Sequence, residues 1–279
     1  NLTAYADRGV QTPHLDRFAE NCVVFNRAYA NSFPTMPARA DFFTGKHTFT
    51  YRGWEPLSQS ETTLAEIISS KGVNSMCVTD TPFFHRDGFH YEKGFDDFIY
   101  TRGNYDTMPD GIDVRRYRTL ETDWPSPRTM FEAERWLQRH YKEEVFLYAD
   151  TWDPHEPWDA PNWYTELYDP EFDGSTPYSA YGKYKDRNMT EEDVRKGYAA
   201  YCGQVTMVDR WIGRLLDTVK VLGLMDNSII IFTSDHGYYF GEHGHYGKSV
   251  MSGPPFQGTI PLPKETPMSF QRSPLYQEV

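Results

Sequence analysis

One succession of segments restricts the fold of this chain more than any other: a long amphipathic helix followed directly by an apolar strand. Thr190 suits the N-cap of a helix that reaches Gly223, a residue type that commonly ends helices. The apolar residues between them recur at spacings of mostly three and four, which places them on one buried face. The next segment, Ser228–Thr233, is apolar on both faces, as strands buried in parallel sheets are. This succession predicts an α/β fold.

The rest of the chain repeats the alternation of helical and extended patterns. Thr63 and Glu66, for example, form a capping box that opens a helix. Such alternation predicts a mostly parallel central sheet with helices on both faces, and in such sheets ligands bind beyond the carboxyl ends of the strands. Apart from the long helix and its strand, we expect helices opening at Thr12, Thr63 and Ser126, and strands over residues 22–30, 73–79 and 145–151.

Charge and composition narrow the class of partner. The formal net charge of −12 argues against a nucleic-acid binder, which normally carries a basic face. A small anionic substrate remains compatible, because a few local cations and a metal ion can reverse the field inside a cleft. No apolar run is long enough to span a membrane, and the three cysteines have neither disulfide nor metal-site spacing. We expect no nucleic-acid or membrane partner, while localisation and oligomeric state stay open.

The run from Thr35 to Lys46 reads Thr-Met-Pro-Ala-Arg-Ala-Asp-Phe-Phe-Thr-Gly-Lys and predicts a short helix. Pro37 suits the first turn of this helix and Gly45 suits its end. Residues four apart share a helix face, so Thr35 and Arg39 can converge on one anion. The helix N-terminus adds unpaired N–H groups and the positive end of a dipole. The run therefore predicts an anion site with a hydroxyl beside it.

Two further groups follow predicted strands. Asp235 and His236 come directly after the last strand, and a carboxylate with an imidazole is half of a divalent-cation site. His155 follows the strand at 145–151, and histidine is the side chain best suited to move a proton near neutral pH. Each of these residues taken alone is more often structural than functional. Their position at strand ends, and the glycine-rich run that leads to Lys248, favour an active site.

These runs together resemble the sulfatase family of the alkaline-phosphatase-like superfamily. The first run is similar to the family signature, in which Cys or Ser is followed by x-Pro-Ser/Ala-Arg and later by Thr-Gly-Arg/Lys. The segment from Asp235 to Lys248 is similar to its Asp-His/Asn-Gly, Gly-Glu-His-Gly and Gly-Lys elements, and His155 to its middle Pro-His-x-Pro element. The resemblance implies that residues 1–279 belong to a sulfatase catalytic domain with an alkaline-phosphatase-like fold.

The resemblance also implies a covalent mechanism at one divalent metal ion, which would be Ca, Mn or Mg. It implies these roles: Thr35 as nucleophile, Arg39 and Lys248 as ligands of the tetrahedral group, His155 as general acid, and Asp235 and His236 as metal ligands. The family's other metal ligands are acidic residues on a first strand, which here would precede Asn1. We therefore expect a piece of a longer domain, without the first strand and the C-terminal part, that binds metal weakly or not at all.

Threonine at the nucleophile position is the main departure from the family pattern. Typical sulfatases carry there an aldehyde hydrate made from Cys or Ser, which Thr35 cannot form because of its methyl group. Aligning on Gly94-Phe95-Asp96 also places Thr79 and Thr81 where many sulfatases have Lys and His. We interpret both as substrate-binding hydroxyls, with ordinary strand-end threonines as the alternative. Phosphonate and phosphate diester hydrolases of the superfamily show a similar replacement.

Three functions stay open at this point. The first is a metal-dependent hydrolase that cleaves a small anionic ester, either a sulfate or a phosphate or phosphonate ester, through a covalent intermediate on Thr35. The second is a phosphotransferase or mutase relative, and the third is a non-catalytic anion-binding protein. Residues 249–273 are rich in Pro and Gly and are expected to form an inserted loop.

Overall fold

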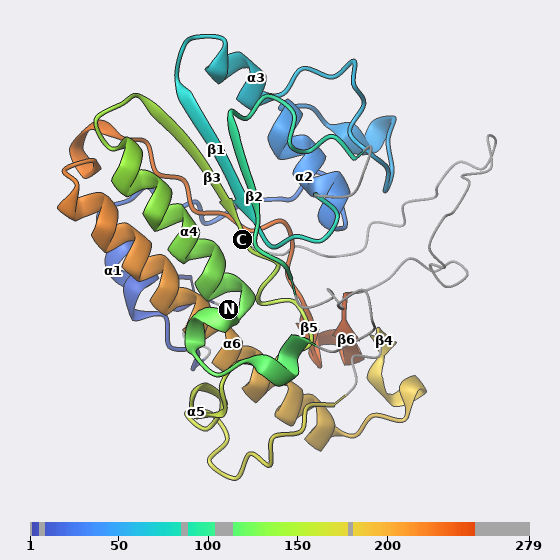
Figure 1. The fold of residues 1–279 in the computed structure, drawn as a ribbon. Helices are drawn as coiled ribbons and strands as arrows, with labels where there is room; N and C mark the ends of the chain where they lie inside the picture. The colour runs from blue at the N-terminus through green and yellow to red at the C-terminus, as the bar shows by residue number, and fades with distance from the viewer. Residues whose placement is uncertain (1, 6–8, 85–88, 104–113, 178–180, 249–279) are drawn as a thin grey trace.

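The computed structural model describes residues 2–5, 9–84, 89–103, 114–177 and 181–248 (Figure 1). The loop expected at residues 249–273 lies outside these residues. The main elements are α1 (Pro13–Ala19), α2 (Thr35–Thr44), α3 (Leu64–Ser69), β1 (Asn74–Thr79), β2 (Asp97–Tyr100), α4 (Pro125–His140), β3 (Val145–Asp150) and α6 (Glu191–Val221). The shorter elements are η1 (Thr48–Thr50), η2 (Val114–Tyr117), η3 (Glu121–Asp123), α5 (Asn162–Thr165), β4 (Gly182–Lys183), η4 (Tyr184–Arg187), η5 (Met225–Asn227), β5 (Tyr239–Phe240), η6 (Glu242–Gly244) and β6 (His245–Gly247).

The main sheet of the described residues is parallel and has the order β2-β1-β3. The strands expected at 73–79 and 145–151 are confirmed to within one residue at each end. Thr79, the last residue of β1, is paired with Asp150, the last residue of β3. Because parallel strands end at the same edge, the segments that follow β1 and β3 begin side by side. This edge is where the sequence predicts an active site.

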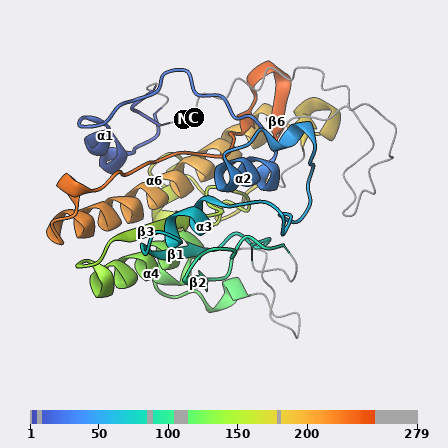
Figure 2. The ribbon, with the colours of Figure 1, turned by 90° about the horizontal axis from the view of Figure 1, so that it is seen from above.

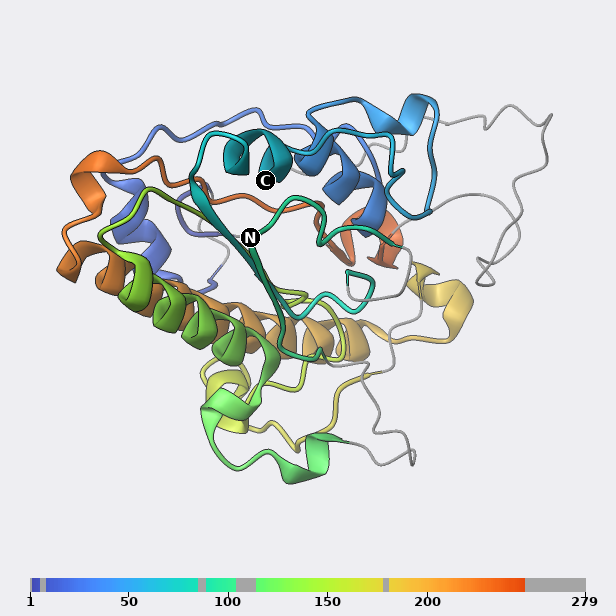
Figure 3. The same ribbon diagram turned by 45° about the horizontal axis from the view of Figure 1, so that its top comes forward.

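Helices cover both faces of this sheet, as predicted. Side chains alternate between the faces of a strand, and β1 shows the alternation clearly. Cys77 packs in a cluster with Met36 and Phe43 of α2, whereas Met76 and Val78 pack with residues of α4 and with apolar residues of α6. Figure 3 shows the result as layers, with α2 and α3 on one side of the sheet and α4 and α6 on the other.

The predicted helix starts are close to the observed ones. Thr190 caps α6 through a complete capping box with Asp193, and Thr63 does the same for α3 with Glu66. The helix predicted from Ser126 begins one residue earlier, at Pro125. Local capping chemistry therefore set the starts of α3 and α6, as expected for interactions that span three residues. None of the described helices has the length and apolar character needed to cross a bilayer.

Two predicted strands are wrong. Residues 22–30 and 228–233 are assigned to no strand, and Val23 and Ile229 are 81% and 91% exposed. Both segments run from the α1 end of the molecule toward α2 and β5 (Figures 2 and 3). A strand requires hydrogen bonds to a neighbouring strand, and no described strand pairs with either segment. The apolar pattern of 228–233 is typical of a strand, but neither the strand nor the burial predicted from it occurs in the described residues.

A second, small sheet lies near the carboxyl edge of the main sheet. It has the order β4-β6-β5 and is antiparallel, so the prediction of a mostly parallel sheet holds for the main sheet only. Tyr246 of β6 is fully buried and packs with Trp158 and Val194. The small sheet therefore fixes the end of β6, directly before Lys248.

Candidate active site

The hydroxyl of Thr35 lies against the imidazole of His236. Thr35 is the first residue of α2 and is 2% exposed. Its Oγ1 lies 3.3 Å from His236 Nε2, although the two residues are 201 positions apart in sequence. The predicted nucleophile and a predicted metal ligand therefore meet in the folded chain. Neither periodicity nor capping could have shown this contact.

His236 presents one specific nitrogen to this contact. Its Nδ1 lies 2.9 Å from the carbonyl oxygen of Gly237, and a carbonyl can only accept, so Nδ1 carries the hydrogen. Nε2 is then the nitrogen with a lone pair, and it also lies 3.4 Å from Asp235 Oδ2. Such a backbone partner on the other nitrogen is typical of metal-binding histidines. The pair Asp235 and His236 thus fits a divalent ion beside the Thr35 oxygen.

Arg39, one turn into α2, is held by two carboxylates. Its Nε and Nη2 donate to the two oxygens of Asp150, each at 2.9 Å, and its Nη1 donates to Asp235 Oδ2 at 2.5 Å. Burial alone would lower the pKa of Arg39, but the charges of Asp150 and Asp235 outweigh it and raise the pKa well above its ordinary value. The guanidinium therefore stays charged in a buried position. Arg39 and Asp235 lie together, as the predicted site requires.

Burial disfavours the ionised form of Asp235 as well, but the charged neighbours of this carboxylate have the larger effect on its pKa. The effect of burial on the pKa of Asp235 is upward, but His236 and Arg39 lower it well below its ordinary range. The carboxylate therefore carries a negative charge at neutral pH. A charged carboxylate and an imidazole lone pair at one point are the donor types that divalent cations such as Mn²⁺ accept.

Asp150 is the site residue that the sequence interpretation passed over. It accepts the bidentate contact from Arg39 and further hydrogen bonds from the hydroxyls of Tyr148, at 3.0 Å, and Thr81, at 2.5 Å. It ends β3, and its place at a strand end, five residues before His155, was the available signal. Its role is to fix the orientation of Arg39 through a two-point contact.

Thr79 and Thr81 are both fully buried. The hydroxyl of Thr79 accepts a hydrogen bond from the backbone N–H of Thr81 at 2.9 Å, and the hydroxyl of Thr81 donates to Asp150. The structure thus brings Thr81 to the site by way of Asp150. The part of the two threonines in substrate binding stays a prediction.

His155 and Lys248 both lie against the indole ring of Trp152. The Trp152 ring lies 4.4 Å from the His155 ring, and Lys248 Nζ lies 5.6 Å from the centre of the same indole. The backbone N–H of Trp152 donates to the buried carboxylate of Asp80 at 2.5 Å, which anchors the segment. All six residues predicted as catalytic or metal-binding therefore gather at the carboxyl edge of the sheet.

The pKa values of His155 and Lys248 are both lowered, and burial is the main cause in each case. Burial lowers the pKa of His155 well below its ordinary value, and the charge of Lys248 lowers it further. Burial also lowers the pKa of Lys248, against the opposing effect of Glu156 and Asp235. A proton donor in such surroundings requires a nearby anion to keep its proton.

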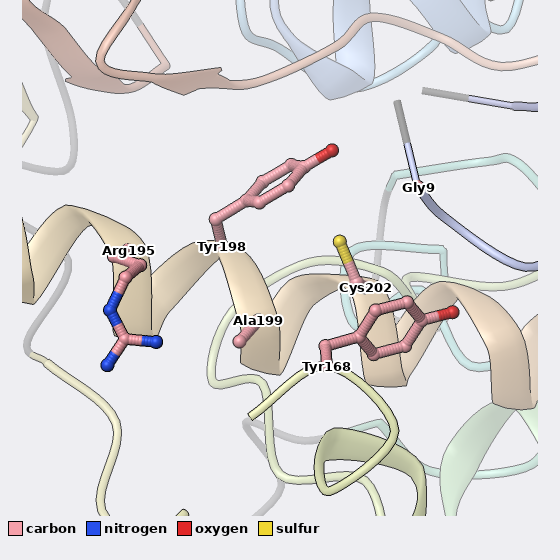
Figure 4. Close-up of a pocket in the computed structure, with 6 residues that line it drawn as sticks. All are labelled: Gly9, Tyr168, Arg195, Tyr198, Ala199 and Cys202. Atoms are coloured by element: carbon pink, nitrogen blue, oxygen red, sulfur yellow. The ribbon is translucent and has the colours of Figure 1, made fainter. Parts of the chain in front are cut away.

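Two cavities differ in their relation to this site. One of about 250 Å³ reaches Asp235 and is lined by parts of α2, by residues 28–31 and by Thr233 and Ser234. The other, of about 210 Å³, lies along α6 and contains none of the predicted site residues (Figure 4). Burial raises the pKa of its Cys202 to about 12, so that thiol stays protonated and is a poor nucleophile.

Metal binding by this chain is expected to be weak. No group of three or more His, Cys, Asp or Glu side chains disposed to hold a metal ion occurs among the described residues, and Arg39 competes for Asp235. Titration calorimetry with Ca²⁺, Mn²⁺ or Mg²⁺ should show no site tighter than about 10⁻⁴ M. The Asp235→Asn variant is the matched control, because it reports the heat of metal binding at other places on the chain. One tight stoichiometric site that this variant loses would contradict the prediction.

Comparison with known proteins places the chain in a family. The Sulfatase family model matches residues 1–262. The chain belongs to the sulfatase family. Among similar sulfatases, the iduronate 2-sulfatase of Mus musculus is 26% identical, with 89% of this chain and 54% of that protein covered. The ulvan-active sulfatase of Formosa agariphila is 30% identical, with 85% and 48% covered.

Solved structures show the same architecture as this sulfatase-family chain. The phosphonate monoester hydrolase of Agrobacterium radiobacter aligns with a TM-score of 0.70 at 22% identity, covering 90% of this chain and 62% of that one. This likeness supports the parallel sheet with helices as the family's fold. The chain spans about half the length of similar curated sulfatases, including the iduronate 2-sulfatase and the ulvan-active sulfatase.

Proposed function

We propose that the whole protein is a hydrolase of small anionic esters that uses Thr35 as its nucleophile at one divalent metal ion. The observation that carries this proposal is the 3.3 Å contact between Thr35 Oγ1 and His236 Nε2. It joins a buried hydroxyl to a nitrogen whose lone pair faces it. Family membership and the phosphonate monoester hydrolase fold support ester hydrolysis as the reaction class.

The residues divide the reaction between them. The Thr35 oxygen attacks the sulfur or phosphorus atom of the substrate in line with the leaving oxygen. Arg39 and Lys248 bind the remaining oxygens on that atom, Arg39 through its forked guanidinium and Lys248 as a point charge. His155 gives a proton from Nε2 to the departing oxygen, a contribution typically of about 10²–10⁴-fold. A divalent ion held by Asp235 and His236 would stabilise the negative charge of the Thr35 oxygen.

The second half of the reaction distinguishes this chain from typical sulfatases. The ester on Thr35 has no second hydroxyl on Cβ and cannot be released by elimination, so water must cleave it. That route suits phosphoryl and phosphonyl esters, whereas a sulfate ester is expected to turn over more slowly. We therefore favour a phosphate or phosphonate ester as substrate, and place a sulfate ester second.

A substrate panel tests the proposal. The whole protein, with Mn²⁺ or Ca²⁺, is given nitrophenyl sulfate, phosphate, phosphodiester and phosphonate esters side by side. Release of nitrophenol from at least one ester is expected, with the phosphorus esters ahead of the sulfate. Transfer to an added alcohol in preference to water would instead indicate a phosphotransferase. Intact anion binding with no release from any ester would indicate a non-catalytic protein and overturn the proposal.

A further inference from the structure

The side chain of Glu156 lies beside Nδ1 of His155. His155 Nδ1 is 2.7 Å from the backbone carbonyl oxygen of Glu156 and 3.2 Å from its carboxylate Oε2. One N–H therefore faces two acceptors of the same residue. Because Nδ1–H is directed at an acceptor, Nε2 is the nitrogen whose protonation distinguishes the neutral ring from the imidazolium.

The Glu156 carboxylate is itself buried and held in place. Its side chain is 12% exposed. The hydroxyl of Tyr181 donates to its Oε1, and Oε2 makes no hydrogen bond within the described residues. The His155 imidazole lies 3.2 Å from that oxygen and forms an ion pair with it only when the ring is doubly protonated. A buried carboxylate beside a histidine nitrogen favours the doubly protonated imidazolium over the neutral ring.

We propose that Glu156 is a positioning residue for His155: its carboxylate, held by Tyr181, lies beside Nδ1 and stabilises the charge of the imidazolium, while Nε2–H is aimed at the leaving oxygen. The inference rests on the proposed function, because it assumes that His155 is the general acid. When Nε2 releases its proton to the leaving oxygen, Nδ1 keeps its own, and the ring ends neutral. Glu156 changes no bond and acts through His155 only.

The charges around this pair explain why such a residue is needed. Lys248, Asp235 and His236 act on His155, and burial together with Lys248 lowers the pKa of His155. Glu156 in turn is near Lys248, Tyr181 and Tyr246, and burial raises its pKa while Lys248 opposes that rise. A negative charge at Nδ1 counters the loss of the His155 proton. Without it, the donor would be neutral over more of the working pH range.

Leaving-group dependence tests this inference. A general acid matters most when the leaving group is a poor one, so Glu156→Gln should lower kcat/KM about tenfold or more for a phenyl ester and less than threefold for the 4-nitrophenyl ester. His155→Ala, measured in parallel, should show the same selectivity with a larger loss. In Glu156→Gln the basic limb of the pH profile of kcat/KM should move to lower pH. A tenfold weaker hold of His155 on its proton corresponds to a shift of about one pH unit.

A matched control is available elsewhere in the chain. A carboxylate oxygen of Glu143 lies 3.1 Å from Nδ1 of His140, the last residue of α4. Glu143→Gln therefore makes the same chemical change beside another histidine. It should leave both esters unaffected. NMR titration of the His155 ring adds a readout that does not depend on turnover: its pKa should fall in Glu156→Gln.

The outcomes distinguish failure of the positioning role of Glu156 from failure of His155 as general acid. Equal losses for both esters in Glu156→Gln, or an unchanged His155 titration, would overturn the positioning role and leave the proposed hydrolase intact. A lowered His155 pKa in a protein whose His155→Ala variant shows no leaving-group selectivity would support the contact but reject His155 as general acid. Tyr181→Phe should shift the same quantities in the same direction by a smaller amount.

Discussion

Replacement of Thr35 by alanine should reduce turnover of every cleaved ester by about 10³-fold or more, because the nucleophilic oxygen is removed. The surrounding cations and the general acid would remain, so binding of the substrate anion should persist. The measurement is single-turnover and steady-state kinetics of the whole protein with the best ester of the panel. Thr35→Ser keeps the oxygen and should keep turnover within about tenfold of the parent.

The control for this variant comes from the other end of the same helix. Thr44 ends α2, and its hydroxyl donates to the carbonyl oxygen of Ala40 at 2.7 Å. Thr44→Ala removes the same atoms from the same helix and should leave kcat within about twofold. Turnover that survives in Thr35→Ala at the level of this control would refute Thr35 as the nucleophile. The reaction would then have to proceed by direct attack of water.

Replacement of Asp150 by asparagine should lower the free energy of unfolding by about 3 kcal/mol or more, because it leaves the buried Arg39 charge without its bidentate partner. The Tyr148 and Thr81 hydroxyls would also lose their charged acceptor. Chemical denaturation monitored by circular dichroism gives the change in stability. Activity should fall in the variant even under conditions where it is folded, since Arg39 is then free to shift away from the substrate.

An exposed ion pair supplies the comparison for Asp150. Glu132 accepts from Arg135 at 2.9 Å, with side chains that are 22% and 50% exposed. Surface pairs of this kind contribute about 1 kcal/mol or less, so Glu132→Gln should cost no more than that. If the two variants unfold at the same denaturant concentration, Asp150 does not stabilise the buried charge of Arg39.

Local patterns predicted where some of the candidate site residues lie in the fold. The start of α2 at Thr35, its end before Gly45, and the placement of His155 and Asp235 after extended segments follow from residues only a few positions away. Asp150 and Glu156 were passed over because the meaning of each depends on a contact. Asp150 becomes a site residue only when Arg39, 111 positions away, reaches it. The proposed role of Glu156 likewise depends on Tyr181, 25 positions away, which donates to its carboxylate beside His155.

The same distinction explains the two strands that are absent. The apolar residues of 228–233 indicate a strand, but a strand is a property of a pair of segments, and no described strand pairs with this one. The sequence by itself determined the helix boundaries, the class of fold and the set of chemical groups, because capping and periodicity act over a few residues. Only the tertiary structure decided which of these groups meet, because contacts between distant residues depend on how the whole chain packs.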